Sequence, residues 1–247
     1  MKVWKGRTAL VAALAVAVLA AFAVWAQVAL ARRCPVNRPS TSAGLLSAFG
    51  AFRSIASEIV WLRAERLQED GQYVELAQLA KALTLSEPHT PEVWSYAAWN
   101  LAYNVSVMMP ESADRWRWVE AAMRLLRDDG LRLNPESAEI HRELAWLFEF
   151  KLGLSLDRAA PYYRARWRET VEGVAQRGAW GELGMRPEVM TAIERALGIS
   201  DRADPFYSAI YWAQLGLARA KGNDRIFLEE IVRQSLTLYR KQTKEER

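Results

Sequence analysis

Apolar residues recur every three to four positions along most of the chain, which is the spacing of one face of an α-helix. The stretch WSYAAWNLAYN, which begins at Trp94, shows this pattern at its densest and contains no charged residue. On a helical wheel of about 100° per residue, Ala98 and Leu101 share a face with Trp94. Trp99 and Tyr103 fall on the opposite face. A helix that is apolar on two sides needs cover on more than one side, so this helix is predicted to lie within a stack of helices.

No run of alternating apolar and polar residues flanked by hairpin turns occurs in the chain. The predicted fold class is therefore all-α. The polar stretch 32–48 is predicted to be a linker, and residues 49–247 are predicted to form one helical domain.

Residues 8–31 form a continuous apolar run without a charge, preceded by a basic tail at residues 1–7. At about 1.5 Å per residue, a run of this length crosses a hydrocarbon core of about 30 Å. We therefore predict an uncleaved transmembrane anchor. The alternative is a secretory signal peptide that is cleaved after Ala31. The anchor is favoured because the run is long for a signal peptide and because Arg32 and Arg33 follow the cleavage site directly.

Basic residues flank the apolar run on both sides, so charge alone orients the anchor weakly. The short basic tail is typical of a bacterial signal anchor, which predicts a single-pass protein of the inner membrane with its domain on the periplasmic side. The other orientation stays open. Cys34 is the only cysteine, which excludes an internal disulfide, and it has no predicted role.

The same internal order of large and small apolar residues recurs in three stretches, which contain Trp94/Ala97/Ala98/Leu101, Leu144/Ala145/Phe148 and Trp212/Leu215/Gly216. Gly71 and Tyr73 mark a turn, and Pro88 and Pro135 end two successive units. This self-similarity resembles the tetratricopeptide repeat, a helix-turn-helix unit of about 34 residues. The resemblance covers roughly residues 57–240. It implies an irregular α-solenoid of about four units.

The layout also resembles bacterial membrane-anchored tetratricopeptide repeat proteins. This resemblance implies a scaffold that assists the assembly of envelope machines such as secretion, pilus, lipopolysaccharide or cytochrome-maturation systems, and it selects none of them. Two insertions interrupt the predicted array, near 105–115 and at 171–205. Within the second, residues 187–198 predict a short extra helix that begins at Pro187 and ends before Gly198. Pro161 is expected in the first turn of its helix.

Alignment of the units places Trp99 and Trp146 at the same repeat position, as it does Tyr103 and Phe150. Tryptophan, tyrosine and arginine dominate the energetics of protein interfaces, and in repeat arrays the first helix of each unit lines the binding surface. We therefore predict a partner-binding groove, in which Arg142 anchors a carboxylate of the partner. The residues predicted to line this groove are Trp61, Trp99, Tyr103, Arg142, Trp146 and Phe150.

An alternative interpretation is that the protein fills its own groove. The candidate segments are residues 48–64 and the last predicted helix, residues 225–241. Either segment, if it lay across Trp99 and Trp146, would leave no room for a partner.

The charge balance of 33 basic and 29 acidic residues, a net charge of +4, does not call for a nucleic-acid partner. Arginine and tryptophan alternate at 114–120 and 164–168, which could favour bases stacked on indoles. Trp116 and Trp118 are about 200° apart on a helix, however, so one is expected to pack inward and the other to face a neighbour. Contact of these residues with an anionic membrane surface is an alternative that stays open.

Catalysis has little support in the sequence. His89 and His141 are the only histidines, and His141 is expected on a helix surface. No phosphate-binding loop, nucleophile elbow or set of metal ligands is present, so no cofactor is predicted. The predicted function is a non-catalytic, membrane-anchored scaffold for proteins of a membrane or envelope complex. A permanent structural subunit of such a complex is the main alternative, and an enzyme with an unrecognised site is the least favoured.

Overall fold

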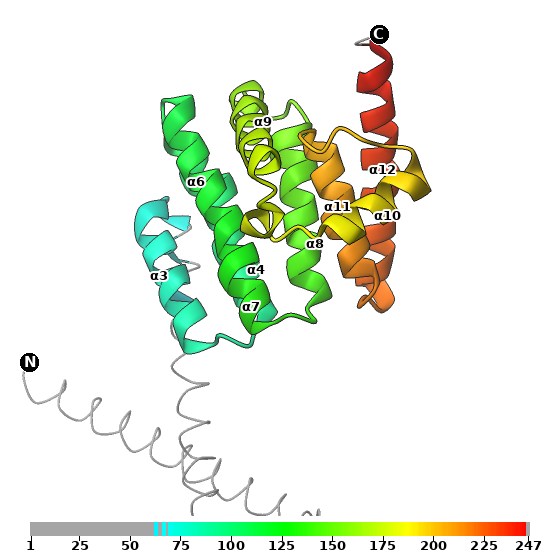
Figure 1. The fold of residues 1–247 in the computed structure, drawn as a ribbon. Coiled ribbons are helices and arrows are strands. Elements are labelled where there is room, and N and C mark those ends of the chain that lie inside the picture. Colours follow the sequence, from blue (N-terminus) through cyan, green and yellow to red (C-terminus); the bar gives the residue numbers. More distant parts are fainter. Residues whose placement is uncertain (1–61, 64–65, 68, 246–247) are drawn as a thin grey trace, which may run out of the picture. The chain divides into compact units, whose positions relative to one another are not determined.

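The structure is a computed structural model that describes residues 62–63, 66–67 and 69–245 (Figure 1). In this part of the chain every regular element is a helix, which confirms the all-α class. The predicted anchor, residues 8–31, and the linker, residues 32–48, lie outside the described residues. Among the residues that are described, no helix has the length and apolar character of a membrane span.

The described helices follow one another with short connections. In chain order they are α3 (Tyr73–Ser86), α4 (Pro91–Trp99), η1 (Asn100–Val105), α5 (Ser106–Met108), α6 (Ser112–Arg124), η2 (Leu125–Gly130), α7 (Leu131–Leu133), α8 (Ala138–Trp146), η3 (Leu147–Gly153), α9 (Ala160–Arg177), η4 (Trp180–Leu183), α10 (Pro187–Leu197), α11 (Pro205–Leu217) and α12 (Gly222–Glu245).

Three long helices each contain a π-helical segment, in which the backbone N–H groups bond five residues back instead of four. The first runs through α4, η1 and α5, the second through α6, η2 and α7, and the third through α8 and η3. The segment η1 begins directly after Trp99, and η3 begins directly after Trp146. The two residues that the sequence comparison equates therefore precede the same irregularity.

Most of the insertion predicted near 105–115 lies in helices. The helix that starts at Pro91 continues to Met108, and α6 begins at Ser112. The short connection is then fixed by Arg115, whose Nε donates to the carbonyl oxygen of Met109 at 2.7 Å and whose Nη2 donates to that of Val107 at 2.8 Å.

The second predicted insertion contains the extra helix that its sequence indicates. Helix α10 starts with Pro187 at its N-terminus and ends at Leu197. Gly198 follows with φ +68°, a left-handed conformation that glycine adopts without strain. Pro161 lies in the first turn of α9, where its missing N–H group would have no helical partner. These local predictions are confirmed.

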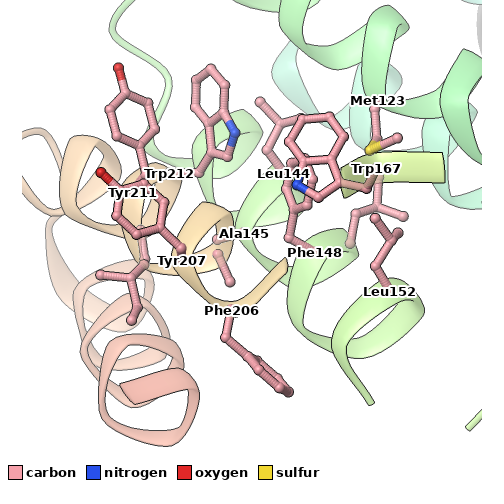
Figure 2. Close-up of a cluster of buried hydrophobic side chains, with 14 of the residues drawn as sticks. Met123, Leu144, Ala145, Phe148, Leu152, Trp167, Phe206, Tyr207, Tyr211 and Trp212 are labelled. Atoms are coloured by element: carbon pink, nitrogen blue, oxygen red, sulfur yellow. The ribbon is translucent and has the colours of Figure 1, made fainter. Parts of the chain in front are cut away.

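Helices α4, α8 and α11 form a row, in which α8 contacts both of the others, and α12 packs against α11 and α8 (Figure 1). Figure 2 shows the core between them, with Leu144, Ala145 and Phe148 surrounded by side chains of α11 and by Trp167. The rings of Phe148 and Trp167 are 4.7 Å apart. As the sequence predicts, Trp94 and Ala98 are buried.

The expectation that His141 lies on a helix surface is wrong. Its side chain is buried between α8 and α11, with Nδ1 2.7 Å from the carbonyl oxygen of Ser137 and its ring 6.1 Å from that of Trp212. Gly216 allows this close packing. A Cβ at that position would lie 3.0 Å from the His141 Cβ and 2.9 Å from a methyl carbon of Leu228 on α12. Helix α11 therefore approaches both neighbours only because it carries glycine there.

Candidate functional site

Helix α8 and segment η3 are buried on every side except one. The side chains that reach solvent are those of Ala138, Glu139, Arg142, Glu143, Trp146 and Phe150. On the neighbouring helix, the equivalent positions Glu92, Tyr96, Trp99 and Tyr103 also reach solvent. We call these ten residues the aromatic strip. It has a polar end, where the two helices begin, and an aromatic end at η1 and η3.

The aromatic end consists of two stacked pairs, one on each helix. The rings of Trp99 and Tyr103 are 6.1 Å apart at 27°, and those of Trp146 and Phe150 are 3.8 Å apart at 19°. Each pair joins the last α-helical residue to the residue four positions later in the π-helical segment, and side chains four positions apart lie on the same face of a helix. Two neighbouring helices thus carry the same aromatic feature where the α-helix passes into a π-helical segment.

These rings are partly open to solvent. Trp99 is 38% exposed, and the other three are half-buried. Tyr103 lies close to Glu143 and Trp146 of the neighbouring helix α8. Burial raises the pKa of the Tyr103 hydroxyl, the Glu143 carboxylate raises it further, and the Trp146 side chain lowers it. The buried Lys151 ammonium lies 5.1 Å from the centre of the Tyr103 ring and pairs with Asp157 at 2.7 Å. The predicted residue Trp61 lies outside the described residues.

The polar end gathers carboxyl groups from both helices. Burial raises the pKa of Glu139, and the neighbouring carboxylates Glu92 and Glu143 raise it further, against the lowering effect of Ser95 and Arg142. Burial likewise raises the pKa of Glu143, although its pairing with Arg142 opposes this. The carboxyl groups are therefore close enough to repel one another.

The sequence predicts that Arg142 anchors the carboxylate of a partner, but carboxylates of the chain itself engage it. Its Nη2 donates to Glu143 at 3.1 Å and its Nε at 3.3 Å. Its Nη1 donates to Asp224 in the first turn of α12. The guanidinium group thus ties α8 to α12 and adds little positive charge to the strip.

The last helix is one of the two segments that the sequence offers as fillers of the groove. Helix α12 buries Leu228, Ile231, Ser235 and Tyr239, spaced at three and four positions, toward α11 and α8. It meets the strip through Asp224. The four rings still reach solvent. Residues 225–241 therefore border the strip and leave its aromatic end accessible. The other proposed segment, 48–64, falls mostly outside the described residues.

Two of the hollows among the described residues lie away from the strip. The larger, of about 610 Å³, lies between α6–η2 and α9. Its arginines pair with carboxylates that also line it, and these pairs are Arg124–Glu120, Arg127–Asp128, Arg166–Glu169 and Arg177–Glu182. Its charges therefore cancel locally and select no ligand. The smaller, of about 440 Å³, lies between α3, α4 and α6, and is mostly apolar. Trp118 lines it, whereas Trp116 is buried, as the helical wheel predicts.

The sequence pattern does not indicate that one carboxyl group is buried. Glu149 in η3 is fully buried, and neither of its oxygens has a hydrogen-bond partner. Burial raises its pKa to about 7, the Ser235 hydroxyl on α12 lowers it somewhat, and the Glu230 carboxylate raises it. The position aligned with it in the preceding stretch is Ala102, which is also fully buried. This alignment could have shown an acid at a core position.

Within the described residues, no group of three or more histidine, cysteine or acidic side chains is arranged to hold a metal ion. Comparisons with protein-family models, with curated proteins and with solved structures gave no match. The aromatic strip, with its two stacked pairs and its carboxyl end, is the candidate site.

Proposed function

We propose that the protein is a non-catalytic, membrane-anchored scaffold that binds a segment of another protein on the aromatic strip. The observation that carries this proposal is the repetition of a solvent-accessible aromatic pair, Trp99–Tyr103 and Trp146–Phe150, on adjacent helices. Large aromatic side chains that remain accessible are the usual anchors of protein interfaces. Stacking already holds these rings in place, so a partner loses little by ordering them.

The scaffold is proposed to be a tetratricopeptide-like array. The row α4, α8 and α11 corresponds to the first helices of three successive units, and α6, α9 and α12 to their second helices. The matching positions of η1 and η3 support a common repeat register. In such arrays the first helices present a continuous surface to a partner, which is where the strip lies.

The membrane anchor at residues 8–31 would hold this surface at the inner membrane, with the domain proposed on the periplasmic side. Tethering raises the effective concentration of membrane partners without any additional contact. Components of an envelope complex are therefore the proposed partners.

A permanent structural subunit is the second candidate, and the apolar hollow beside Trp118 favours it. That hollow is lined by Ala77, Ala97, Leu101 and Leu125 as well, which is the composition of a surface that another chain covers. In this case the hollow, rather than the strip, would carry the interface.

The experiment that tests the proposal is extraction of the tagged full-length protein from native membranes in mild detergent, with identification of the retained proteins. Wild type is compared with the Trp99→Ala/Trp146→Ala double variant. Tyr162→Ala is the matched control, because Tyr162 on α9 is 37% exposed, much like Trp99 at 38%, and lies off the strip. Circular dichroism verifies that each variant is folded.

A defined set of envelope proteins that wild type and the control retain, and the double variant loses, would support the scaffold and its strip. Retention of the same set by all three would place the interface elsewhere and favour the structural subunit. If wild type retains no protein specifically, the scaffold proposal is wrong.

A further inference from the structure

Acidic side chains outnumber basic ones in the aromatic strip. The strip and the α12 residue that touches it contain the carboxyl groups of Glu92, Glu139, Glu143 and Asp224, with the guanidinium group of Arg142 as their cation. Arg142 contacts two of these carboxylates. The face that remains for a partner is therefore acidic at one end and aromatic at the other.

This acidity recurs in both repeats, as the aromatic pairs do. Glu92 precedes Trp99 by seven residues, and Glu139 precedes Trp146 by seven. Seven residues are about two helical turns, so each carboxyl group lies on the same side of its helix as the tryptophan. A partner that follows either helix would meet a carboxylate and then, two turns further, a stacked aromatic pair.

Resting on the proposed function, we infer that the segment bound by the aromatic strip is basic, with lysine or arginine side chains among apolar ones. Cationic side chains would pair with Glu92 and Glu139, and their stems and the apolar residues would cover the rings. This is the reverse of the carboxylate anchor that the sequence alone suggests for Arg142, because that guanidinium group is already engaged.

The aromatic end suits a cation as well as an apolar residue. Lysine and arginine are attracted to the faces of tryptophan, tyrosine and phenylalanine rings. The protein shows such an arrangement beneath the strip, where the Lys151 ammonium lies 5.1 Å from the centre of the Tyr103 ring. An acidic segment, in contrast, would meet both the carboxyl groups and the negative faces of the rings.

The test measures binding of short fluorescent peptide pools to the full-length protein in a neutral detergent, which itself attracts no charged peptide. The pools share random aromatic and aliphatic positions and differ in the remaining positions, which are lysine, glutamine or glutamate. Fluorescence anisotropy gives the affinity at low and at high salt. The protein variants are Glu92→Gln/Glu139→Gln, Trp99→Ala/Trp146→Ala and Arg142→Gln, with the exposed Glu169→Gln on α9 as the charge control.

We expect the lysine pool to bind most tightly, with an affinity that falls as salt rises. Neutralising Glu92 and Glu139 should weaken it by roughly three- to tenfold, since partly exposed ion pairs are individually weak. Removing both tryptophans should weaken it by about 30-fold or more, as for interface hot spots. Glu169→Gln should have no effect.

The Arg142→Gln variant distinguishes a basic partner segment from an acidic one. It frees the carboxylates of Glu143 and Asp224, so the lysine pool should bind this variant as tightly as wild type or more tightly. Weaker binding of the lysine pool, or a loss confined to the glutamate pool, would overturn the inference.

The failure of the inference and the failure of the proposed function give different results. If the glutamine or glutamate pool binds best and its binding still depends on Trp99 and Trp146, the strip is a binding site but its partner is not basic. If no pool binds, or if binding is indifferent to both tryptophans, the strip is not a peptide site and both proposals fall.

Discussion

Replacing Glu149 with glutamine tests whether a carboxyl group is buried without a partner where η3 faces α12. Glu149 is fully buried, its oxygens accept no hydrogen bond, and the Ser235 hydroxyl on α12 likewise has no partner. Burial disfavours the charged carboxylate. It raises the pKa of Glu149 from its ordinary value of 4.5 to about 7; the Ser235 hydroxyl lowers this pKa and the Glu230 carboxylate raises it.

The sign of the effect on stability follows from proton binding. Between the ordinary pKa of 4.5 and a folded pKa of about 7, the folded protein keeps a proton on Glu149 that the unfolded chain releases. The free energy of unfolding therefore falls as pH rises through this window and levels off above it. Each pKa unit corresponds to about 1.4 kcal/mol, so the loss attributable to Glu149 is about 3 kcal/mol.

The assay is urea unfolding of the full-length protein in neutral detergent, followed by tryptophan fluorescence at about pH 5 and about pH 8. Glutamine keeps the shape but cannot ionise, so Glu149→Gln should lose much less stability than wild type between the two pH values. The buried amide has its own cost, which is present at both values and cancels in the difference. The control Glu169→Gln, on the exposed side of α9, should follow wild type. Equal pH dependence in wild type and Glu149→Gln would refute the buried, unpartnered carboxyl group.

Four further substitutions are measured by the same unfolding assay. Gly216→Ala should destabilise the protein by about 1–3 kcal/mol, because the new Cβ would lie 2.9 Å from a methyl carbon of α12. In Gly173→Ala on α9, the new Cβ would meet only the end of a flexible arginine at 3.5 Å, so this variant should be more stable than wild type by up to about 1 kcal/mol. A larger loss of stability in Gly173→Ala than in Gly216→Ala would contradict this description of the packing. Asp157→Ala should cost about 3–5 kcal/mol, since it leaves Lys151 buried without its carboxylate at 2.7 Å, and a cost below about 1 kcal/mol would show that this pair is solvated. Asn134→Ala should cost about 1–2 kcal/mol, because its side chain donates to two main-chain carbonyls at 2.8 and 3.1 Å, and no change would argue that water replaces it.

The features that the sequence predicts correctly are set by local structure. The helical period places Trp94 and Ala98 in the core, and the ends of α10 follow from a proline and a glycine at fixed positions. These signals act within one or two turns of chain, so no knowledge of the neighbouring helices is needed.

The features that it misses depend on contacts between helices. His141 is buried because Gly216 lets α11 approach, and the two residues are far apart in the chain. Arg142 is engaged by Asp224 of the last helix, which no spacing within its own helix reveals. The π-helical segments also leave no clear mark on the apolar period. The helix that contains η1 extends to Met108, into the insertion predicted near 105–115.

Three consecutive residues of segment η3 have side chains that contact three different parts of the protein. Glu149 is buried near Ser235 of α12, which lowers the pKa of its carboxyl group. Phe150 stacks on Trp146 in the aromatic strip, and Lys151 pairs with Asp157, which precedes α9.

Because these three side chains contact different elements, we predict that they act independently although they are neighbours. Glu149→Gln should change the pH dependence of stability and leave peptide binding within about twofold, which corresponds to about 0.4 kcal/mol. Phe150→Ala should weaken binding and leave the pH dependence unchanged. The double variant should then show both effects, with energies additive to within about 0.5 kcal/mol. A larger deviation would mean that η3 shifts as a unit when either residue changes, and that occupancy of the strip and protonation of Glu149 are coupled through its backbone.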